Sequence, residues 1–549
     1  MIKILVADSF SNAGMSILEA CREIDVVSMT GLSPEKLREE LHNHDGVIIR
    51  SATKLTGAIL KDQPRLKLIV RAGVGVDNID LASATHEGIV VMNTPAGNTT
   101  STAEHTMAMM LALSRNIGPA AASMKAGEWN RKQFTGSQLS GKTLGVIGMG
   151  RVGQTVAARA RMFGMTILGF DPFFSSEKAA EQGIELFRDL EEMIPSCDYL
   201  TVHTPLNAET RDLVSTSQFE IMKAGTRIIN CARGGIVNEV ALLQALNSSQ
   251  IAGAALDVFT EEPPGKTALV EHPKVLCTPH LGASTDEAQQ QVAVEAAEIV
   301  LGYFLKGEVR FAVNMVPVSG AEMEVLRPYL DLTYRLGLML AQLRGSEHIR
   351  AANIRYRGEV AGKNTKLLTA GLTAGLLEKA LDSTVNIVNA NIFARERGLE
   401  IEESTLSATA DFSSLVTVEL VTDVQSYSIS GTIFGQEFLR LVRYQHYQLE
   451  TFLDGTMLIF HHHDVPGLIG YVGTVCGEYQ VNISSMALGR SPETPGADSV
   501  AVLNVDGDFP SEAREKLLNH PEVTGVELVV LPPAGAALPW LVRTRQAST

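Results

Sequence analysis

The stretch GKTLGVIGMGRVG, residues 141–153, decides the fold of the chain around it. Residues 143–147 form a short apolar run that predicts a buried strand, and three spaced glycines follow it directly. A helical pattern then covers 152–163, and a second strand is predicted over 166–170. A glycine-rich turn alone is weak evidence, because such turns also occur without a ligand. Between a strand and a helix, however, G-x-G-x-x-G spacing is typical of a βαβ unit that binds a dinucleotide.

The residues of this unit have separate expected tasks. Gly148 permits the tight turn, Gly150 lets the backbone approach a pyrophosphate, and Gly153 allows the helix to pack closely on the strand. The helix N-terminus offers unpaired N–H groups and a positive dipole end to the phosphates. Asp171 ends the next strand, where its carboxylate accepts hydrogen bonds from ribose hydroxyls and repels a 2′-phosphate, so NAD is predicted rather than NADP. Two residues of the first helical turn join this predicted set, Arg151 and Val152.

Outward from this unit, short apolar runs alternate with helical stretches in both directions, the rhythm of parallel sheets covered by helices. Two long helices, expected over 101–116 and 284–305, bracket the second series of strands. We therefore predict an α/β fold class with two parallel-sheet domains. Residues 1–97 and 283–315 are expected to form a discontinuous substrate domain, and 98–282 the NAD-binding domain.

Three polar residues follow predicted strands of the second series: Arg233, Glu262 and His280. Open α/β sheets bind ligands at the carboxyl ends of their strands. Hydride transfer from an alcohol needs a proton acceptor, a group that orients it, and a cation for a substrate carboxylate. His280, Glu262 and Arg233 match these needs in that order. Taken singly, each has a simpler explanation: a satisfied polar histidine, a turn-capping glutamate and a surface arginine.

Together these segments resemble the D-2-hydroxyacid dehydrogenase family, and within it the long-form branch that acts on 3-phospho-D-glycerate. The matching stretches are RSATK (50–54), RAGVGVDNID (71–80), NTTSTAEHT (98–106), GKTLGVIGMGRVG (141–153), CARGG (231–235), DVFTEEPP (257–264) and TPHLGAST (278–285). The resemblance implies a flavodoxin-like substrate domain beside a Rossmann NAD domain. It also implies that His280 is the acid–base, Glu262 its partner and Arg233 the ligand of the substrate carboxylate.

The resemblance further implies oxidation of 3-phospho-D-glycerate to 3-phosphohydroxypyruvate, the first step of L-serine synthesis, by a homodimer or homotetramer. The expected substrate contacts are Arg50, Ser51, Arg71, Gly75, Asn98, Arg131 and Lys132. In dimers of the family the last two, with Trp129, lie against the neighbouring subunit's site; a solvated face is the alternative for both. The expected contacts near the nicotinamide are Thr204, Ala232 and Asp257.

The C-terminal part divides into an α+β intervening domain at 316–452, an ACT domain at 453–531 and a poorly packed tail at 532–549. The ACT resemblance rests on HHHDVPGLIGYVGTV (461–475) and VNISSMALGR (481–490), with βαββαβ order. It implies an L-serine site, and the matching positions are His462, Asp464 and Asn482. No metal site is predicted, because on a strand His462 points away from His461 and His463.

Composition excludes several classes of function. The 549 residues carry 46 Lys+Arg against 62 Asp+Glu, a net charge of −16, so no nucleic-acid or anionic-membrane partner is expected. Five cysteines without a CxxC pair predict neither disulfides nor structural zinc, which is typical of the cytosol. The N-terminus lacks the features of a signal peptide, and the apolar runs are too short to span a membrane. A soluble cytoplasmic protein is the expectation.

Two other functions remain open from the sequence. A glyoxylate or hydroxypyruvate reductase would use the same three polar residues, although the context of Arg50 and Arg71 and the ACT-like segment disfavour it. An NADH-sensing, corepressor-like binding protein can keep all three residues as well. The ACT-like segment is the main feature that argues against this binding protein.

Overall fold

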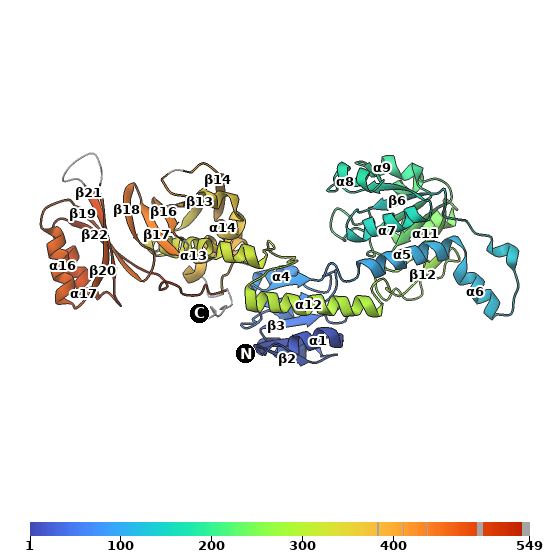
Figure 1. Ribbon diagram of the computed structural model, residues 1–549, viewed down its shortest axis with the longest axis horizontal. Helices are drawn as coiled ribbons and strands as arrows, with labels where there is room; N and C mark the ends of the chain where they lie inside the picture. The colour runs from blue at the N-terminus through green and yellow to red at the C-terminus, as the bar shows by residue number, and fades with distance from the viewer. Residues whose placement is uncertain (381–383, 410, 436, 491–497, 541–549) are drawn as a thin grey trace.

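The computed structural model describes residues 1–380, 384–409, 411–435, 437–490 and 498–540. The molecule is elongated, with four sheets following one another along its long axis (Figure 1). The N-terminal sheet lies between the second sheet on one side and the two C-terminal sheets on the other (Figure 1). This arrangement confirms two parallel α/β sheets followed by an α+β part and an ACT fold. Within the described ranges, no helix combines the length and the apolar content needed to cross a membrane.

The N-terminal sheet has five parallel strands in the order β2-β1-β3-β4-β5, as in flavodoxin-like folds. Its strands are β1 (Ile2–Val6), β2 (Ile24–Ser28), β3 (Gly46–Ile49), β4 (Leu68–Arg71) and β5 (Val90–Asn93). Its helices are α1 (Asn12–Glu19), α2 (Pro34–Asn43), α3 (Gly57–Leu60), α4 (Leu81–His86) and the returning α12 (Asp286–Lys306). Because Ala296 and Val300 of α12 share one core with Ile4 and Val70, the later segment completes the first sheet.

The second sheet has seven parallel strands in the order β12-β11-β10-β9-β6-β7-β8, a Rossmann arrangement. The strands are β6 (Thr143–Ile147), β7 (Thr166–Phe170), β8 (Glu185–Phe187), β9 (Tyr199–Val202), β10 (Thr226–Asn230), β11 (Ile251–Leu256) and β12 (Val275–Cys277). The helices are α5 (Thr99–Ser114), α6 (Ile117–Lys125), α7 (Arg151–Met162), α8 (Ser176–Glu181), α9 (Leu190–Met193), α10 (Thr216–Ile221) and α11 (Glu239–Asn247), with 3₁₀ turns η1 (Arg131–Phe134) and η2 (Ile194–Ser196).

The third sheet is mixed, in the order β14-β13-β15-β16-β17-β18, and a helix pair packs beside it. Its strands are β13 (Ile349–Gly358), β14 (Glu400–Leu406), β15 (Ser414–Thr422), β16 (Ser426–Phe434), β17 (Phe438–Tyr444) and β18 (Tyr447–Phe452). Its helical segments are α13 (Gly320–Leu343), α14 (Thr365–Leu377), α15 (Ala390–Glu396), η3 (Glu359–Gly362) and η4 (Glu378–Ala380). A Cβ on Gly337 would lie 2.1 Å from the Leu372 carbonyl oxygen, so glycine lets α13 and α14 touch along their backbones.

The last sheet confirms the expected βαββαβ order. Its elements are β19 (Thr456–His463), α16 (Leu468–Glu478), β20 (Ile483–Arg490), β21 (Asp498–Val505), α17 (Ser511–Leu518) and β22 (Val523–Val530). The strands pair antiparallel as β20-β21-β19-β22. Both helices pack their apolar residues on this sheet, and Val472 and Leu517 lie in its core.

The segment 532–540 of the predicted tail is largely exposed but is attached to the third sheet and its helices at both ends, and residues 541–549 lie outside the described residues. Arg335 on α13 is 1% exposed, and its guanidinium donates to the carbonyls of Leu453 (3.1 Å), Pro532 and Pro533 (3.0 Å). It also pairs with Asp331 at 2.7 Å. Trp540 then packs edge-on against Tyr334, with ring centroids 4.9 Å apart. The Pro532 and Pro533 carbonyls also accept the N–H groups of Gly455 (3.5 Å) and Ala536 (3.1 Å), so the buried arginine and the backbone together hold this segment.

Replacing this arginine should loosen the C-terminal part. We expect Arg335→Met to lower the stability of the third and fourth sheets by about 3 kcal/mol, because the half-buried Asp331 carboxylate and the Leu453 carbonyl lose their donor and the carbonyls of Pro532 and Pro533 each lose one. Thermal unfolding and the rate of proteolysis near residue 532 measure the effect. Arg395→Met, on the exposed side of α15, is the control. Equal melting temperatures of Arg335→Met and Arg395→Met would contradict this role for Arg335.

Candidate active site

The predicted acid–base pair is formed in the structure. His280 follows β12 and Glu262 follows β11, and the Nδ1 of His280 lies 2.7 Å from Oε2 of Glu262. The second carboxylate oxygen accepts the Phe259 N–H at 3.1 Å. Burial by itself raises the pKa of Glu262, but the contact with His280, the Phe259 N–H and the charge of Arg233 outweigh it and leave that pKa below its usual value. An ionised Glu262 therefore orients the imidazole and favours a proton on Nδ1.

Asp257 holds the loop that carries His280. This carboxylate is 1% exposed and accepts hydrogen bonds from the Thr278 hydroxyl (2.5 Å) and from the N–H groups of Leu281 (2.7 Å) and Gly282 (2.9 Å). His105 on α5 lies 3.2 Å from the same carboxylate. Burial raises the pKa of Asp257, yet these donors outweigh it and keep that pKa below its usual value. Sequence reasoning assigned Asp257 to the nicotinamide end; in the structure, its oxygens serve mainly to fix the His280 loop.

Arg233 lies across the junction between the first two sheets. Its Nε donates to Asp77 at 3.0 Å, and its Nη1 donates to the Ala232 carbonyl at 2.7 Å. Asn230 fixes this turn, because its amide donates to the Arg233 carbonyl and its oxygen accepts the Ala232 N–H. A Cβ on Gly75 would lie 1.7 Å from Nη2 of Arg233, so only glycine leaves room for the guanidinium. The predicted neighbours Arg233 and Gly75 therefore do meet.

Two further predicted arginines lie close enough to Arg233 to affect one another's charge. Arg71 ends β4, and Arg50 follows β3 and donates to the carbonyl and the hydroxyl of Ser9 at 3.2 Å. Burial, together with the charges of Arg233 and Arg50, lowers the pKa of Arg71 to about 10. Its Nε is buried and has no partner among the described residues. Ser51 follows Arg50 and is exposed. Asp77 pairs with Arg233, and Asp8 also acts on the charge of Arg71, so two carboxylates lie among the three arginines. The buried Nε of Arg71, which has no partner among the described residues, favours an anionic ligand here.

The glycine-rich turn has the geometry expected of a dinucleotide site. Gly148 has φ of +92°, and a Cβ there would lie 2.7 Å from the His203 carbonyl oxygen. A Cβ on Gly153 would lie 2.0 Å from the Gly148 oxygen, whereas the space beside Gly150 is open. Asp171 accepts the Met149 N–H at 2.8 Å, which places its carboxylate beside the turn. Since α7 starts at Arg151 and Val152 without a side-chain cap, its first N–H groups are available to phosphates.

Several buried polar atoms around this turn have no partner within the described part of the chain. They are the side-chain oxygens of Asn98, Thr99 and Thr204 and the Nδ1 of His203. Buried polar atoms are normally paired, so orphaned atoms next to an open glycine turn fit a bound polar cofactor and substrate. Thr204 and Asn98 were predicted to contact the nicotinamide and the substrate. Thr99 and His203 were not, although both lie beside recognised motifs.

Arg131 and Lys132 lie away from the arginine cluster formed by Arg50, Arg71 and Arg233. Both lie in η1, on the exposed segment that follows α6, and α6 projects from the end of the molecule (Figure 1). Neither has a salt bridge among the described residues. They are therefore not brought to the arginine cluster of their own chain.

The three residues predicted for an effector site do not lie together within one chain. His462 is 4% exposed, and its Nε2 is buried without a partner in the described ranges. Asp464 pairs with Arg490, whereas the amide of Asn482 donates to Asp506 at 2.6 Å. His462 faces Ser499 and Ile483 faces Val505 on β21, so Asn482 lies about 20 Å along the sheet from His462.

Comparison with known proteins agrees with this architecture. Three family models match: the D-isomer specific 2-hydroxyacid dehydrogenase NAD-binding domain (107–282), the D-3-phosphoglycerate dehydrogenase intervening domain (325–445) and the ACT domain (456–522). D-3-phosphoglycerate dehydrogenase of Bacillus subtilis is 40% identical over 97% of this chain and 100% of its own. The enzyme of the same name from Methanocaldococcus jannaschii has the same identity and coverage.

A solved structure extends the likeness to the catalytic half. The NAD⁺-bound 3-phosphoglycerate dehydrogenase of Entamoeba histolytica matches 57% of this chain and 99% of its own, with 29% identity and a TM-score of 0.50. Full-length identity of 40%, matched domains and the geometry of His280, Glu262 and Arg233 agree with one another. The chain is thus an NAD-dependent dehydrogenase and belongs to the D-3-phosphoglycerate dehydrogenase family, within the D-isomer specific 2-hydroxyacid dehydrogenases.

Proposed function

We propose that the protein oxidises 3-phospho-D-glycerate to 3-phosphohydroxypyruvate, the entry to L-serine synthesis. The observation on which this rests is the 2.7 Å contact of His280 with Glu262 at the edge of a cluster of three arginines. The contact supplies a base for the alcohol, and the cluster supplies cations for a substrate with a carboxylate and a phosphate. The cytosolic location expected from the sequence stays a prediction.

In the oxidative direction His280 takes the hydroxyl proton on Nε2, because Nδ1 is held against Glu262. The imidazolium that forms is stabilised by the ionised carboxylate, and the same imidazolium is the proton donor when the keto acid is reduced. A positioned base of this kind typically contributes about 10²–10⁴-fold in rate. Arg233 holds the substrate carboxylate and lies beside the carbonyl that forms at C2, where its charge favours the polarised oxygen.

The arginine cluster gives the substrate its orientation. Arg233 at the end of β10 is assigned to the carboxylate, together with the backbone at Gly75 and the side chain of Asn98. Arg50 and Arg71, at the ends of β3 and β4, are assigned to the phosphate. An unphosphorylated hydroxy acid would leave Arg71 buried near two other cations without an anion, which is costly.

The residues around the glycine turn fit NAD, which when bound accepts the hydride from C2. Gly148, Gly150 and Gly153 shape the turn for the pyrophosphate, and Asp171 faces the ribose hydroxyls. Thr204 and the Ala232 segment remain assigned to the nicotinamide end.

We also propose that L-serine is an effector bound at the fourth sheet. The unpaired Nε2 of buried His462 supports a ligand there, and Asp464 suits its amino group. Because Asn482 lies at the other end of its own sheet, a site with all three residues requires a second copy of the chain. A homodimer or homotetramer would also give the projecting Arg131 and Lys132 a neighbouring active site to face.

The activity is tested by following NADH absorbance with three acids. We expect turnover with 3-phospho-D-glycerate and at least 100-fold lower kcat/KM with D-glycerate and D-lactate, because neither offers Arg50 and Arg71 an anion. His280→Ala should abolish turnover while the Kd for NAD stays within about twofold. Equal rates with all three acids would refute the phosphate assignment. Parallel loss of NAD binding and turnover would refute the role of His280.

Gly75→Ala tests the proposed carboxylate site without replacing a charged residue. The new methyl would displace the Arg233 guanidinium, the mobile end of a side chain, so the fold should remain intact. Losing a charge-assisted contact to the substrate should raise KM about tenfold or more and leave the Kd for NAD unchanged. Gly470→Ala, where the added methyl meets open space, is the control. An unchanged KM would show that Arg233 is not the carboxylate ligand.

The effector site is tested by a pair of histidine variants. We expect His462→Ala to raise the concentration of L-serine needed for half inhibition at least tenfold, because it removes a buried donor or acceptor from the ligand. His463→Ala, on the opposite face of the same strand, should keep the inhibition. If His462→Ala is inhibited at the same concentration as the parent chain, the serine site lies elsewhere.

A further inference from the structure

The first residue of α7, Arg151, is a cation at a helix end that disfavours cations. A helix N-terminus carries a partial positive charge, so acidic residues are usual in the first turn and basic residues are not. The first turn of α7 has no acidic residue, and its N-cap, Gly150, has no side chain to offer. Arg151 is exposed and forms no salt bridge within the described ranges. The position of this arginine therefore needs another group to offset its charge.

The guanidinium of Arg151 lies over an aromatic ring that belongs to the other sheet. Its central carbon, Cζ, is 5.8 Å from the centroid of the Phe311 ring, which is within the range of a cation–π contact. Arg151 opens a helix of the second sheet, whereas Phe311 follows α12 and lies beside β5 of the first sheet. The contact therefore crosses the junction between the first two sheets.

The backbone holds Phe311 in a conformation that few side chains adopt. Its φ is +55°, in the left-handed region. The Phe311 carbonyl accepts the Asn93 N–H at 3.3 Å, and the Val313 N–H donates to the Val91 carbonyl at 2.9 Å. Both partners belong to β5, so this segment is attached to the first sheet. Backbone strain persists where the surroundings impose it, and it clusters at functional sites. The ring is thus presented to Arg151 from a fixed frame.

A carboxylate of α12 lies close enough to Arg151 to be affected by its charge. Oε2 of Glu295 is buried and has no partner in the part of the chain that the structure describes. Burial raises the pKa of Glu295, while the N–H groups of Ala96 and Gly97 and the charge of Arg151 act in the opposite direction. The Glu295 carboxylate and the face of the Phe311 ring therefore both stabilise a cation at the start of α7.

The ring and a phosphate use different parts of the guanidinium. A cation–π contact occupies the flat face, whereas the N–H donors of arginine point outward in the plane of the group. Among the described residues, the Arg151 side chain contacts a ring and donates to no oxygen. Its N–H edge is therefore available to a phosphate while the face rests on Phe311. The glycine turn that precedes Arg151 is the part of the chain shaped for a pyrophosphate.

We propose that Phe311 is a positioning residue for the cofactor: its ring, held on the first sheet, supports the Arg151 guanidinium so that the N–H edge meets the pyrophosphate of NAD. The proposal rests on the assignment of the glycine turn to that pyrophosphate. Because the ring and the guanidinium belong to different sheets, full affinity for the pyrophosphate requires both sheets to be in place. Cofactor binding is thereby linked to the position of the first sheet.

Two ligands, ADP-ribose and adenosine, test the proposal on the full-length protein, because only ADP-ribose carries the pyrophosphate. Both affinities are measured by displacement of NADH, followed by its fluorescence. We expect Phe311→Leu to raise the Kd for ADP-ribose about three- to fivefold and to leave the Kd for adenosine unchanged. Phe311→Tyr keeps the ring and should bind ADP-ribose like the parent chain. Phe438→Leu, which removes a ring 5.8 Å from Arg440, is the matched control and should change neither Kd.

Unchanged ADP-ribose affinity in Phe311→Leu would overturn the proposal. Equal weakening of ADP-ribose and adenosine would overturn it as well, because the loss would then not depend on the pyrophosphate.

A double-mutant cycle tests whether the ring acts through the guanidinium. Arg151→Leu should weaken ADP-ribose about tenfold or more, because it removes a charge-assisted contact. Adding Phe311→Leu to Arg151→Leu should cause no further loss, since the ring then has no cation to support. Additive losses would refute the role of Phe311 and leave the phosphate assignment standing. No saturable binding of ADP-ribose to the parent chain would refute the phosphate assignment, and the role of Phe311 with it.

Discussion

The buried carboxylate of Asp257 is the interaction on which the catalytic geometry depends. It ties the end of β11 to the loop after β12, through Thr278, Leu281 and Gly282, and to α5 through His105. The loop that carries His280, the proposed acid–base, would otherwise be free to move, since loops have few internal constraints. Asp257 fixes the position of this loop, so the single contact with Glu262 is enough to orient the His280 ring. The imidazole is therefore held at the junction of the two sheets before substrate binds.

The remaining features of the site follow from parallel strands that end at a shared junction. Arg50 and Arg71 lie at the carboxyl ends of strands of the first sheet, and Arg233 follows a strand of the second. The chain carries a net charge of −16, yet here burial, together with the charges of Arg233 and Arg50, lowers the pKa of Arg71 to about 10. Local charge, set by strand ends, decides what this molecule binds, and the overall charge does not.

Much of this was predictable because short-range patterns determine it. The turn at Gly148, the helix after it and the βαββαβ order of elements in the last domain depend on local sequence, and the sequence predicted them. The edge strands β2 and β8 were missed, since a half-exposed edge lacks a continuous apolar run. Contacts between distant segments have no local signature, so His105 beside Asp257, and Arg335 holding the tail, could be found only from the structure.

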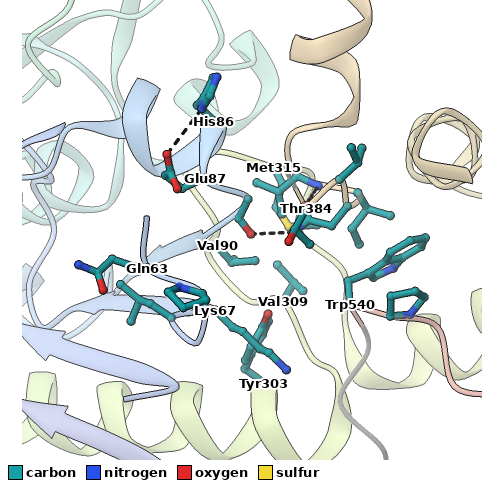
Figure 2. A pocket seen from close by; sticks show the side chains of 18 of the residues that line it. Gln63, Lys67, His86, Glu87, Val90, Tyr303, Val309, Met315, Thr384 and Trp540 are labelled. Carbon is teal, nitrogen blue, oxygen red and sulfur yellow. Dashed lines mark hydrogen bonds and ion pairs between the residues drawn. The ribbon is translucent and has the colours of Figure 1, made fainter. Parts of the chain in front are cut away.

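The first sheet also connects the active site with the part of the molecule on its opposite edge. A cavity lined by Lys67 and Val90 lies at the amino ends of β4 and β5 (Figure 2), and β4 ends in Arg71. Strand β4 has a hydrogen-bonded neighbour on each side, β3 and β5, and its hydrogen bonds and packing leave it little freedom to bend. A change in how the C-terminal half packs against the amino end of β4 would therefore act on the strand that ends in Arg71, one of the arginines proposed for the substrate phosphate.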